Sequence, residues 1–454
     1  MFCKILIANR GEIAVRIIRA CRELGISTVA ICSEADKTAL HAQIADETVC
    51  VGPAPTKDSY LNVQAILSAC TMTGAQAVHP GFGFLSENAA FARACKKCGI
   101  TFIGPDAATI DLMGNKAQAK LTTKNAGVPV VPGSDGAVRS VEEAVEIAQK
   151  IGYPVMIKAS AGGGGRGIRL IQNKKELTAA LPVVKQEALS FFGDDGVYIE
   201  KFIIEPRHIE IQLLADHYGN VVHLGERDCS MQRRNQKVLE ECPSPASVMT
   251  EDLRSRMGAD AVKVAKAVGY KNAGTIEFLV DEKGNYYFME MNTRVQVEHP
   301  ITEMVTGVDI VKQQILIAAG EKLHLTQKDV KQTGHAIECR INAENPAENF
   351  RPSPGTIMAL YVPGGPGIRI DSAVYAGYTI TPYYDSMIGK LIAYAPTREE
   401  AILKMRWALA EFLVEGVDTN IDFQLSLLRN ENFVSGSYDI GFLGRNKEKL
   451  LGRE

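Results

Sequence analysis

The sequence has no long apolar run and almost no net charge. No stretch reaches the roughly 18 apolar residues that a membrane-spanning helix needs, and the amino-terminal MFCKILIANR does not join a basic segment to a signal-type apolar run. The 50 basic and 53 acidic side chains leave a formal net charge of −3. This balance gives no electrostatic support for binding to nucleic acids or membranes, and we expect a cytoplasmic protein.

The chain also lacks the cysteine patterns of secreted or zinc-binding proteins. Its ten cysteines are accompanied by no secretory signal, so we expect reduced thiols rather than a disulfide framework. Cys95 and Cys98 form a lone CxxC in the amphipathic helical pattern FARACKKCG, without a second CxxC or paired histidines. We expect a structural role for this pair.

What the chain does have is length and an alternating pattern at its amino-terminal end. Its 454 residues suggest about three domains, at roughly 100–200 residues per domain. KILIAN, STVAICS, AQAVHPG and ITFIGP are typical of strands and alternate with helical patterns. This predicts a parallel, doubly wound sheet with a ligand site at the carboxyl ends of its strands, where residues 9–12 and 79–81 fall.

A smaller unit is expected after the prolines and glycine of AGVPVVPGS, where YPVMIKAS and IRLIQ predict strands joined by AGGGGRG. Gly162, Gly164 and Gly167 satisfy GxGxxG, but a dinucleotide-binding loop opens a helix, whereas an apolar strand follows here. Glycine N–H groups can approach phosphate oxygens closely, and Lys158 precedes the loop. The sequence therefore predicts a flap over phosphates, with a flexible hairpin tip as the alternative.

The segment TIEFLVDEKGNYYFMEMNTR predicts a hairpin with its turn at Lys283 and Gly284. If these two residues form the whole loop, counting outward places Glu277 opposite Glu290 on one face. Because like charges across a ladder are destabilising and the neighbouring residues are apolar, a divalent cation between the two carboxylates would compensate. A slipped register, with one glutamate on the far face, is the alternative.

The next segment, NTRVQVEHP, alternates polar and apolar residues. In an extended strand, Arg294, Gln296 and Glu298 would share one face. A guanidinium, an amide and a carboxylate in this arrangement could hold a small planar oxyanion, with the carboxylate free to remove its proton. A solvated edge strand is an equally good interpretation of the pattern.

These segments belong to a set that matches one family in order and spacing across nearly the whole chain. The set is IANRGEIAVRI, HPGFGFLSEN, IGPDAATIDLMGNK, GYPVMIKASAGGGGRG, EPRHIEIQ, ERDCSMQRRNQK, GTIEFL, EMNTRVQVEHPITE, GHAIECRINAE and PYYDSMIGKLI. Together they resemble biotin carboxylases, which are ATP-grasp enzymes. Amino-acid ligases that share only the ATP-grasp core would match the glycine loop and the acidic pair, but not MQRR or VQVEHP.

The resemblance implies a mixed α/β protein (α+β in part) with an ATP-grasp fold and an amino-terminal Rossmann-like, doubly wound domain. The expected domains are residues 1–115, an ATP-grasp domain at 116–330 with a mobile glycine-rich lid at about 131–203, and a carboxy-terminal domain at 331–445. The implied enzyme is a ligase that uses ATP and bicarbonate to carboxylate biotin through carboxyphosphate, the first half-reaction of acetyl-CoA carboxylase in fatty acid synthesis.

The resemblance also implies the residues of an ATP site that uses two Mg²⁺ or Mn²⁺ ions. The expected ATP-binding residues are Lys116, Lys158, Gly164, Gly165, Glu200, Lys201, Ile203, His208, Gln232, Asn235, Glu277 and Glu290. The metals would be held by Glu277 and Glu290, with Asn292 assisting.

Bicarbonate and biotin have their own implied residues. The expected bicarbonate-binding residues are Lys237, Arg294, Gln296, Val297 through its backbone, and Glu298. The resemblance makes Glu298 the base that deprotonates bicarbonate. Arg340 would stabilise the ureido oxyanion of biotin, and Phe82 would stack on the biotin ring. The implied catalytic residues are thus Lys237, Arg294, Glu298 and Arg340.

Two positions depart from the family pattern. Asn235 in MQRRNQK stands where a histidine is usual, and an asparagine can still donate to a ribose or phosphate oxygen but cannot carry a charge. We expect altered nucleotide affinity or pH dependence. Phe82 in HPGFGF stands where a tyrosine is common, so the ring can stack but the hydroxyl hydrogen bond is lost.

The sequence lacks the biotinylation motif AMKM, and its nearest segment, LKMRW around Lys404, lies in a helical pattern. We therefore expect biotin to arrive on a separate biotin carboxyl carrier protein, with carboxyltransferase subunits as further partners and a homodimer as the assembly. The leading hypothesis is the acetyl-CoA carboxylase subunit. The alternatives are a subunit of a pyruvate or other acyl-CoA carboxylase and a catalytically silent ATP-binding scaffold.

Overall fold

The computed structural model describes residues 1–159, 168–192 and 194–453. Its amino-terminal unit contains a five-stranded parallel sheet, which confirms the predicted doubly wound arrangement. In spatial order the strands are β3 (Glu47–Cys50), β2 (Ser27–Cys32), β1 (Lys4–Ile7), β4 (Ala77–His79) and β5 (Thr101–Phe102). The edge strand β3 was not predicted, because its residues are mostly exposed and lack a buried apolar face.

Alternate residues of β1 explain why helices cover both faces of this sheet. Ile5 and Ile7 pack with the helix α1 (Gly11–Glu23). Leu6, and Ala8 just after the strand, pack on the opposite face with α3 (Val63–Thr73) and α4 (Ala89–Lys97). The other helices of this unit are α2 (Leu40–Ile44) and α5 (Ala107–Gly114). Cys95 is buried in α4 and Cys98 is exposed at its end, and both thiols are free.

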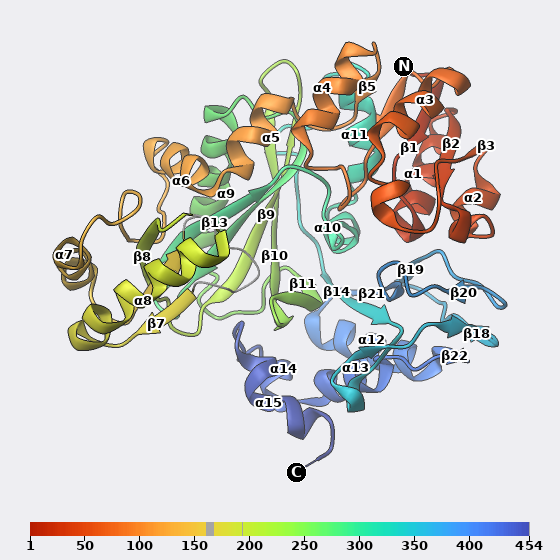
Figure 1. Ribbon diagram of the computed structural model, residues 1–454. Coiled ribbons are helices and arrows are strands. Elements are labelled where there is room, and N and C mark those ends of the chain that lie inside the picture. Colours follow the sequence, from red (N-terminus) through yellow and green to blue (C-terminus); the bar gives the residue numbers. More distant parts are fainter. Residues whose placement is uncertain (160–167, 193, 454) are drawn as a thin grey trace.

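A small unit follows the connecting helix α6 (Lys116–Asn125) and lies to the left in Figure 1. Its three strands are antiparallel in the order β7-β6-β8, and its apolar core is separate from the others. Its elements are α7 (Val141–Ile151), β6 (Val155–Ala159), β7 (Ile168–Ile171), α8 (Lys174–Phe192) and β8 (Val197–Lys201). The glycine run, including Gly164 and Gly165, lies outside the described residues.

An eight-stranded sheet forms the centre of the molecule and continues into the carboxy-terminal region. In spatial order its strands are β13 (Tyr286–Asn292), β12 (Asn272–Val280), β9 (Arg207–Ala215), β10 (Val221–Arg233), β11 (Gln236–Cys242), β14 (His335–Asn342), β21 (Met387–Ala395) and β19 (Ile368–Ser372). Its neighbouring helices are α9 (Glu251–Ala267), α10 (His299–Thr306) and α11 (Ile310–Ala318). The antiparallel β11–β14 pair crosses from one predicted domain to the next.

One face of this sheet is apolar and covered by helices. The other face carries the buried polar residues, together with apolar residues that pack on α10 and α11. Helix α9 packs on Ile209, Ile211 and other alternate residues of β9 and β12. The carboxy-terminal helices pack in the same way on β14 and β21. These helices are α12 (Arg398–Glu411), α13 (Ile421–Arg429), α14 (Glu431–Val434) and α15 (Phe442–Leu450).

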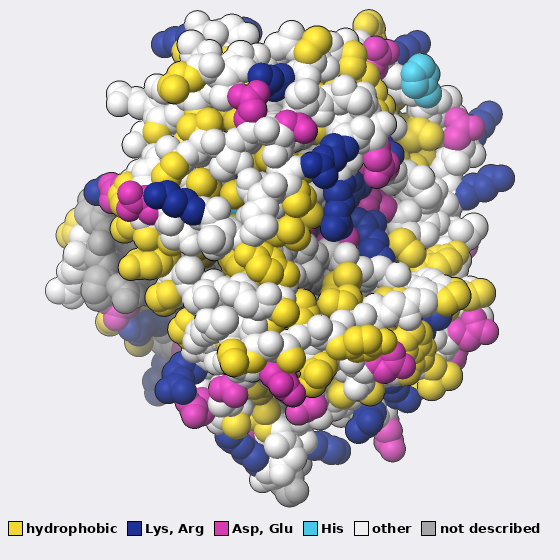
Figure 2. Space-filling view, turned by 90° about the vertical axis from the view of Figure 1, so that its right-hand side faces the viewer, with side chains coloured by type: hydrophobic (Ala, Val, Ile, Leu, Met, Phe, Trp, Pro, Cys, Tyr) yellow, Lys and Arg dark blue, Asp and Glu magenta, His cyan; other side chains and the backbone are white. Residues whose placement is uncertain are grey.

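Short strands complete the carboxy-terminal region, and those labelled in Figure 1 lie at its lower right. They are β15 (Glu344–Asn345), β16 (Arg351–Pro352), β17 (Gly355–Thr356), β18 (Ala359–Tyr361), β20 (Thr379–Ile380) and β22 (Leu413–Glu415). Among the described helices, none is long and apolar enough to cross a membrane. Figure 2 faces the side of α1 and β19 and shows basic and acidic side chains gathered in a hollow between its upper and lower parts.

Candidate active site

Carboxylates from several strands lie on the polar face of the central sheet. In β9, His208, Glu210 and Gln212 alternate with apolar residues that face α9, so the period of two places all three on the opposite face. Glu210 pairs across the ladder with Glu277 of β12. Because both carboxylates are buried, each needs a cation or a hydrogen-bond donor nearby.

The hairpin β12–β13 confirms the predicted pairing of Glu277 with Glu290, although the predicted two-residue turn was wrong. The turn is longer, because Val280 pairs with Tyr286 and the N–H of Asp281 donates to the carbonyl of Asn285. A register shift next to Glu277 adds one residue to β13 and offsets the longer turn. The slipped-register alternative is thereby excluded.

The segment after β13 differs from the expected extended strand. Residues 294–298 form a bend and a turn that lead into α10. The turn still brings the predicted residues together: Arg294 donates to Gln296 Oε1 over 2.7 Å, and Gln296 donates to Glu277 Oε1 over 3.1 Å. Glu298 and Gln296 are buried, which excludes a solvated edge strand. We call residues 294–298 the catalytic loop, after the role that we propose for them.

Lys237 lies at the centre of the buried carboxylates. Its Nζ is 2.7 Å from Glu210, 3.1 Å from Glu277 and 2.6 Å from Glu298. Although burial opposes its charge, these acidic neighbours and the thiol of Cys229 raise the pKa of Lys237 well above its usual range. It is therefore a fixed cation in this site.

Glu298 is held between two cations, Lys237 on one side and Arg340 on the other. Arg340 Nη2 is 3.0 Å from Glu298 Oε2, and Arg340 Nε donates to Glu240 Oε1 over 2.7 Å. Burial alone would raise the pKa of Glu298, but Lys237, Arg340 and Arg227 lower it well below its usual range. Glu298 is thus a carboxylate at neutral pH, in the form that can accept a proton.

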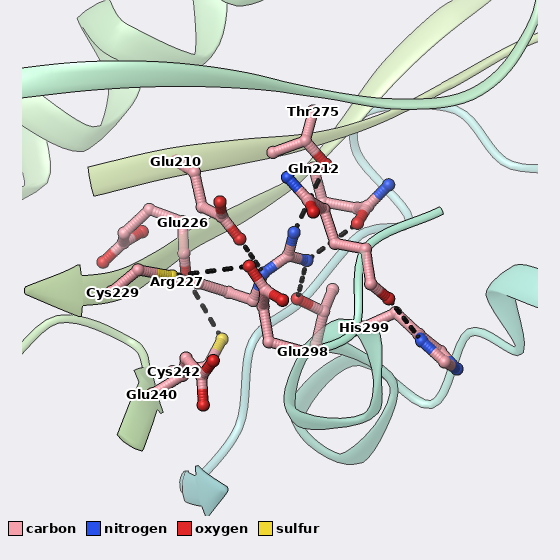
Figure 3. Close-up of polar contacts among 12 residues, drawn as sticks. Glu210, Gln212, Glu226, Arg227, Cys229, Glu240, Cys242, Thr275, Glu298 and His299 are labelled. Carbon is pink, nitrogen blue, oxygen red and sulfur yellow. Dashed lines mark hydrogen bonds and ion pairs between the residues drawn. The ribbon is translucent and has the colours of Figure 1, made fainter. Parts of the chain in front are cut away.

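Sequence reasoning missed the residues that support this cluster. Arg227 is fully buried and donates to Glu210 over 2.5 Å and to Gln212 over 2.7 Å. Figure 3 shows Arg227 at the centre of this network, with Glu298 and Cys229 beside it. The alternation in RHIEIQ could have shown that these side chains of β9 share one face, but not which cation would contact them.

A further missed contact joins the amino-terminal unit to the catalytic loop. Glu87 accepts a hydrogen bond from Arg294 Nε over 2.8 Å and another from the N–H of Thr293 over 3.1 Å. Glu87 lies within HPGFGFLSEN, a segment that the family resemblance includes, but the sequence analysis predicted no role for Glu87. Phe82 lies earlier in that segment. It is partly buried and packs against the apolar cluster that includes α1.

The predicted phosphate-binding lysines lie nearer the surface. Lys158 Nζ is 2.5 Å from Glu200, which also accepts from Lys120 over 2.8 Å. Burial raises the pKa of Glu200, but the two lysines more than offset it and the net shift is downward.

The side chain of Lys116 is 79% exposed and its Nζ is 3.5 Å from Glu290. A cavity of about 240 Å³ beside Lys116 is lined in part by Glu290 and Asn292.

Other predicted nucleotide-binding residues lie in the central sheet and at the end of the small unit. Gln232 Nε2 lies 2.7 Å from His208 Nδ1, so these two are neighbours as expected. Lys201 donates to the backbone carbonyls of Gly152 and Tyr153. Ile203 follows β8 and is half-buried. Asn235 has a φ of +63° in the turn between β10 and β11, a conformation that asparagine tolerates well.

The acidic pair has the chemistry expected of a magnesium site. Glu277 and Glu290 offer carboxylate oxygens, and Asn292 donates to Glu277 Oε1 over 2.8 Å. Mg²⁺ prefers oxygen ligands and is bound in such sites by one or two carboxylates together with substrate phosphates. The residues present therefore fit this ion. His208 and Glu210 add ligand atoms within 4.8 Å of those of Glu277.

The fold and the site together define an ATP-grasp enzyme. Lys158 of the small three-stranded unit, Lys116 of the connecting helix and the acidic pair of the larger sheet are suited to a metal–nucleotide complex. The buried carboxylate of Glu298 shares the cation of Lys237 with Glu277. Comparison with family models gives the particular family. Residues 1–110 match the biotin carboxylase N-terminal domain, residues 115–326 match the ATP-binding domain of the carbamoyl-phosphate synthase L chain, and residues 338–445 match the biotin carboxylase C-terminal domain.

Curated relatives agree with these matches over the full length. The chain is 60% identical over 444 residues to biotin carboxylase 1 of Bacillus subtilis, covering 98% of each protein. It is 55% identical over 443 residues to the 2-oxoglutarate carboxylase small subunit of Hydrogenobacter thermophilus, covering 98% of this chain and 93% of that subunit. The chain therefore belongs to the biotin carboxylase family and is an ATP-dependent ligase.

Solved structures of relatives have the same fold. The biotin carboxylase domain dimer of Hydrogenobacter thermophilus 2-oxoglutarate carboxylase, solved with MgADP, ADP and bicarbonate, matches with a TM-score of 0.90 at 54% identity over 99% of both chains. The biotin carboxylase of Campylobacter jejuni, solved as a β-γ-ATP complex, matches with a TM-score of 0.91 at 49% identity over 98% of this chain and 99% of that one.

Proposed function

We propose that this protein uses ATP and bicarbonate to carboxylate biotin carried on a separate protein, as the first half-reaction of acetyl-CoA carboxylase. The observation that carries the proposal is the position of Glu298, a buried carboxylate between Lys237 and Arg340. The two cations beside this base could stabilise two successive anions: Lys237 the bicarbonate, and Arg340 the oxyanion of biotin. The catalytic residues in this proposal are Lys237, Arg294, Glu298 and Arg340.

ATP would bind between the small unit and the central sheet. Lys116 and Lys158 would contact the phosphates, together with Gly164 and Gly165 of the glycine run. The remaining nucleotide-binding residues of the proposal are Glu200, Lys201, Ile203, His208, Gln232, Asn235, Glu277 and Glu290. Two Mg²⁺ or Mn²⁺ ions held by Glu277, Glu290 and Asn292 would neutralise the charge that develops on the phosphates.

Bicarbonate would bind against the catalytic loop. Lys237, Arg294, Gln296 and the backbone N–H of Val297 would hold its oxygens, because each of the four can donate a hydrogen bond. Glu298 would take the bicarbonate proton while a bicarbonate oxygen attacks the γ-phosphorus of ATP and the bond to the β-phosphate oxygen breaks. The products of this step are carboxyphosphate and ADP, and positioning supplies most of the rate enhancement.

The second step would transfer the carboxyl group to biotin. Carboxyphosphate breaks down to CO₂ and phosphate, and the phosphate takes the proton from the ureido nitrogen of biotin. That nitrogen then attacks CO₂. Arg340 would stabilise the ureido oxyanion that forms, and Phe82 would stack against the biotin ring.

The assembly in this proposal follows from the same family. Biotin would arrive on a biotin carboxyl carrier protein, carboxyltransferase subunits would complete the pathway, and the chain would act as a cytoplasmic homodimer. Support for the dimer comes from the relative that was solved as a dimer. The proposed domains are residues 1–115, 116–330 with its lid at about 131–203, and 331–445. Asn235 would alter the affinity for the nucleotide or its pH dependence. Phe82 would keep the stacking on biotin without the hydroxyl hydrogen bond.

The molecule that finally accepts the carboxyl group could also be 2-oxoglutarate, pyruvate or an acyl-CoA other than acetyl-CoA, since a 2-oxoglutarate carboxylase subunit is 55% identical to this chain. The first experiment is to measure ADP release with and without bicarbonate and free biotin. We expect ADP release to require bicarbonate and to increase with biotin, and release that is independent of bicarbonate would contradict the proposal. Mixing the carboxylated carrier with candidate transferases would identify the acceptor.

A further inference from the structure

The carbonyl oxygens of two successive peptide groups of the catalytic loop are contacted by buried side chains that have no role in the proposed chemistry. His299 Nδ1 lies 2.8 Å from the carbonyl oxygen of Gln296, and Lys390 Nζ donates to the carbonyl oxygen of Val297 over 2.8 Å. A carbonyl can only accept, so His299 carries its proton on Nδ1. The two anchors come from different elements, α10 and β21.

The geometry of the peptide bond links these contacts to the substrate. In a planar trans peptide the C=O and the next N–H point in opposite directions. Holding the carbonyl of Gln296 therefore directs the N–H of Val297 away from His299, and this N–H is the proposed bicarbonate donor. Holding the carbonyl of Val297 likewise fixes the peptide from which Glu298 begins.

Lys390 is an unusual residue to use for this purpose, because its side chain is fully buried. Its Nζ lies 3.1 Å from Glu12 Oε1 of α1 and 3.8 Å from Asp371 Oδ2 of β19. Burial lowers the pKa of Lys390, but Glu12, Glu338 and Asp371 more than offset this and raise it. The lysine is thus a cation connected to the amino-terminal and carboxy-terminal regions at once.

Stability alone is a poor explanation for such a group. A buried ion pair is often no more stabilising than apolar side chains of similar volume, because both charges lose their hydration. What an ammonium adds is a directed hydrogen bond to one carbonyl, in addition to its ion pairs. An apolar residue could fill the same space but could not orient the peptide of Val297.

We infer that Lys390 and His299 are positioning residues for bicarbonate, which act by orienting the peptide groups on either side of Val297. Neither side chain touches the substrate. This inference rests on the proposed function, because it assigns the consequence to the bicarbonate step. It extends the site beyond the catalytic loop to the ion pair between Lys390 and Glu12.

The sharpest test uses His299, because asparagine can place an amide N–H near the position of Nδ1 and leucine cannot. We expect His299→Leu to lower kcat/KM for bicarbonate about 10- to 100-fold in bicarbonate-dependent ADP release, while the KM for ATP changes less than about threefold. His299→Asn should recover most of the loss. Equal kcat/KM values for the two variants, or a parallel change in the KM for ATP, would overturn the role of His299.

Lys390 needs a paired change, because removing the lysine alone leaves Glu12 uncompensated. We expect the double variant Glu12→Gln/Lys390→Met to fold and to lose about 10-fold or more in kcat/KM for bicarbonate. The matched control is Lys404→Met, since Lys404 also donates to two backbone carbonyls, of Pro366 and Tyr394, away from the catalytic loop. Unchanged bicarbonate kinetics in the double variant would overturn the role of Lys390.

The unmodified protein separates this inference from the function on which it rests. If the natural sequence shows no bicarbonate-dependent ADP release, the proposed function fails. If it shows this activity and His299→Leu and the double variant retain normal bicarbonate kinetics, only the inference fails. Should either variant not fold, its partner variant still decides the question, since the two anchors hold different peptides.

Discussion

The proposed active site has two ends, one for bicarbonate and one for the phosphates of ATP, and they are built in different ways. At the bicarbonate end, Glu298 and Glu240 are completely buried and paired with cations of the chain itself. At the phosphate end, the side chain of Lys116 is 79% exposed and that of Glu290 is 37% exposed. The first end neutralises its own charges, whereas the second leaves its charges accessible to a ligand.

This difference fits the size and charge of the two substrates. Bicarbonate is small and offers few contacts, so its site gains most from donors that are already oriented and excluded from water. A metal–nucleotide complex carries several charges and can order exposed lysines when it binds. We therefore expect changes at the bicarbonate end to act mainly on the chemical step, and changes at the phosphate end to act mainly on binding.

The largest expected effect is at Glu298. The variant Glu298→Gln keeps the shape but cannot accept a proton, and we expect kcat for bicarbonate-dependent ADP release to fall about 1,000-fold. The affinity for ADP, measured by calorimetry, should stay within about threefold, because the change lies at the other end of the site. A variant with more than about a tenth of the original kcat would show that Glu298 is not the base.

The buried ion pair between Glu241 and Arg398 lies outside the proposed site and shows how burial and a nearby cation together set a pKa. Glu241 accepts from Arg398 over 2.7 Å, and although burial raises the pKa of Glu241, Arg398 and His335 lower it to about 2. A lowered pKa stabilises the fold above the unfolded value of 4.5, and this stabilisation disappears as the pH falls toward 2.

The test of this linkage is Glu241→Gln, which removes the titration. We expect the original protein to exceed the variant in free energy of unfolding at pH 6, and the difference to shrink by up to about 3 kcal/mol as the pH falls. Urea unfolding at a series of pH values measures it. A difference that stays constant from pH 6 to pH 3 would contradict the lowered pKa. ADP release at pH 7 should be unchanged.

Arg340 is proposed to act on biotin, so the variant Arg340→Met should affect the second chemical step more than the first. We expect biotin carboxylation to fall about 100-fold and bicarbonate-dependent ADP release without biotin to fall less than 10-fold, because the oxyanion forms only in the second step. Burial raises the pKa of Glu240 to about 7, so this carboxyl can take up a proton at neutral pH when Arg340 is lost. Equal losses in both assays would refute the assignment.

The smallest effect is expected at the exposed end. Lys116→Met should raise the KM for ATP about 10-fold with kcat nearly unchanged, since a single exposed cation contributes mainly to phosphate binding. The melting temperature should hardly change, because exposed ion pairs contribute little to stability. Lys124→Met is the control, as Lys124 is also exposed and pairs only with Asp135 among the described residues. A kcat loss as large as that of Glu298→Gln would remove the distinction between the two ends.

Much of the architecture could be predicted because it depends on local patterns. The alternation of strands and helices predicted the parallel amino-terminal sheet, and the hairpin pattern predicted that Glu277 faces Glu290. The second prediction held although the turn was longer than expected, because a register shift in β13 restored the pairing. The prediction that the catalytic loop is a strand was wrong. Alternating polar and apolar residues are also compatible with a turn that packs on the sheet, so the pattern alone could not distinguish the two.

The sequence by itself determined which residues share a face and which segments resemble biotin carboxylases. Only the tertiary structure decided which charges meet. Lys237 and Glu298 are 61 positions apart, and Glu298 and Arg340 are 42 apart, so their contact depends on how β11, β14 and the catalytic loop pack together. The protonation state of each group follows from that packing, because burial penalises a charge and a nearby opposite charge compensates for it.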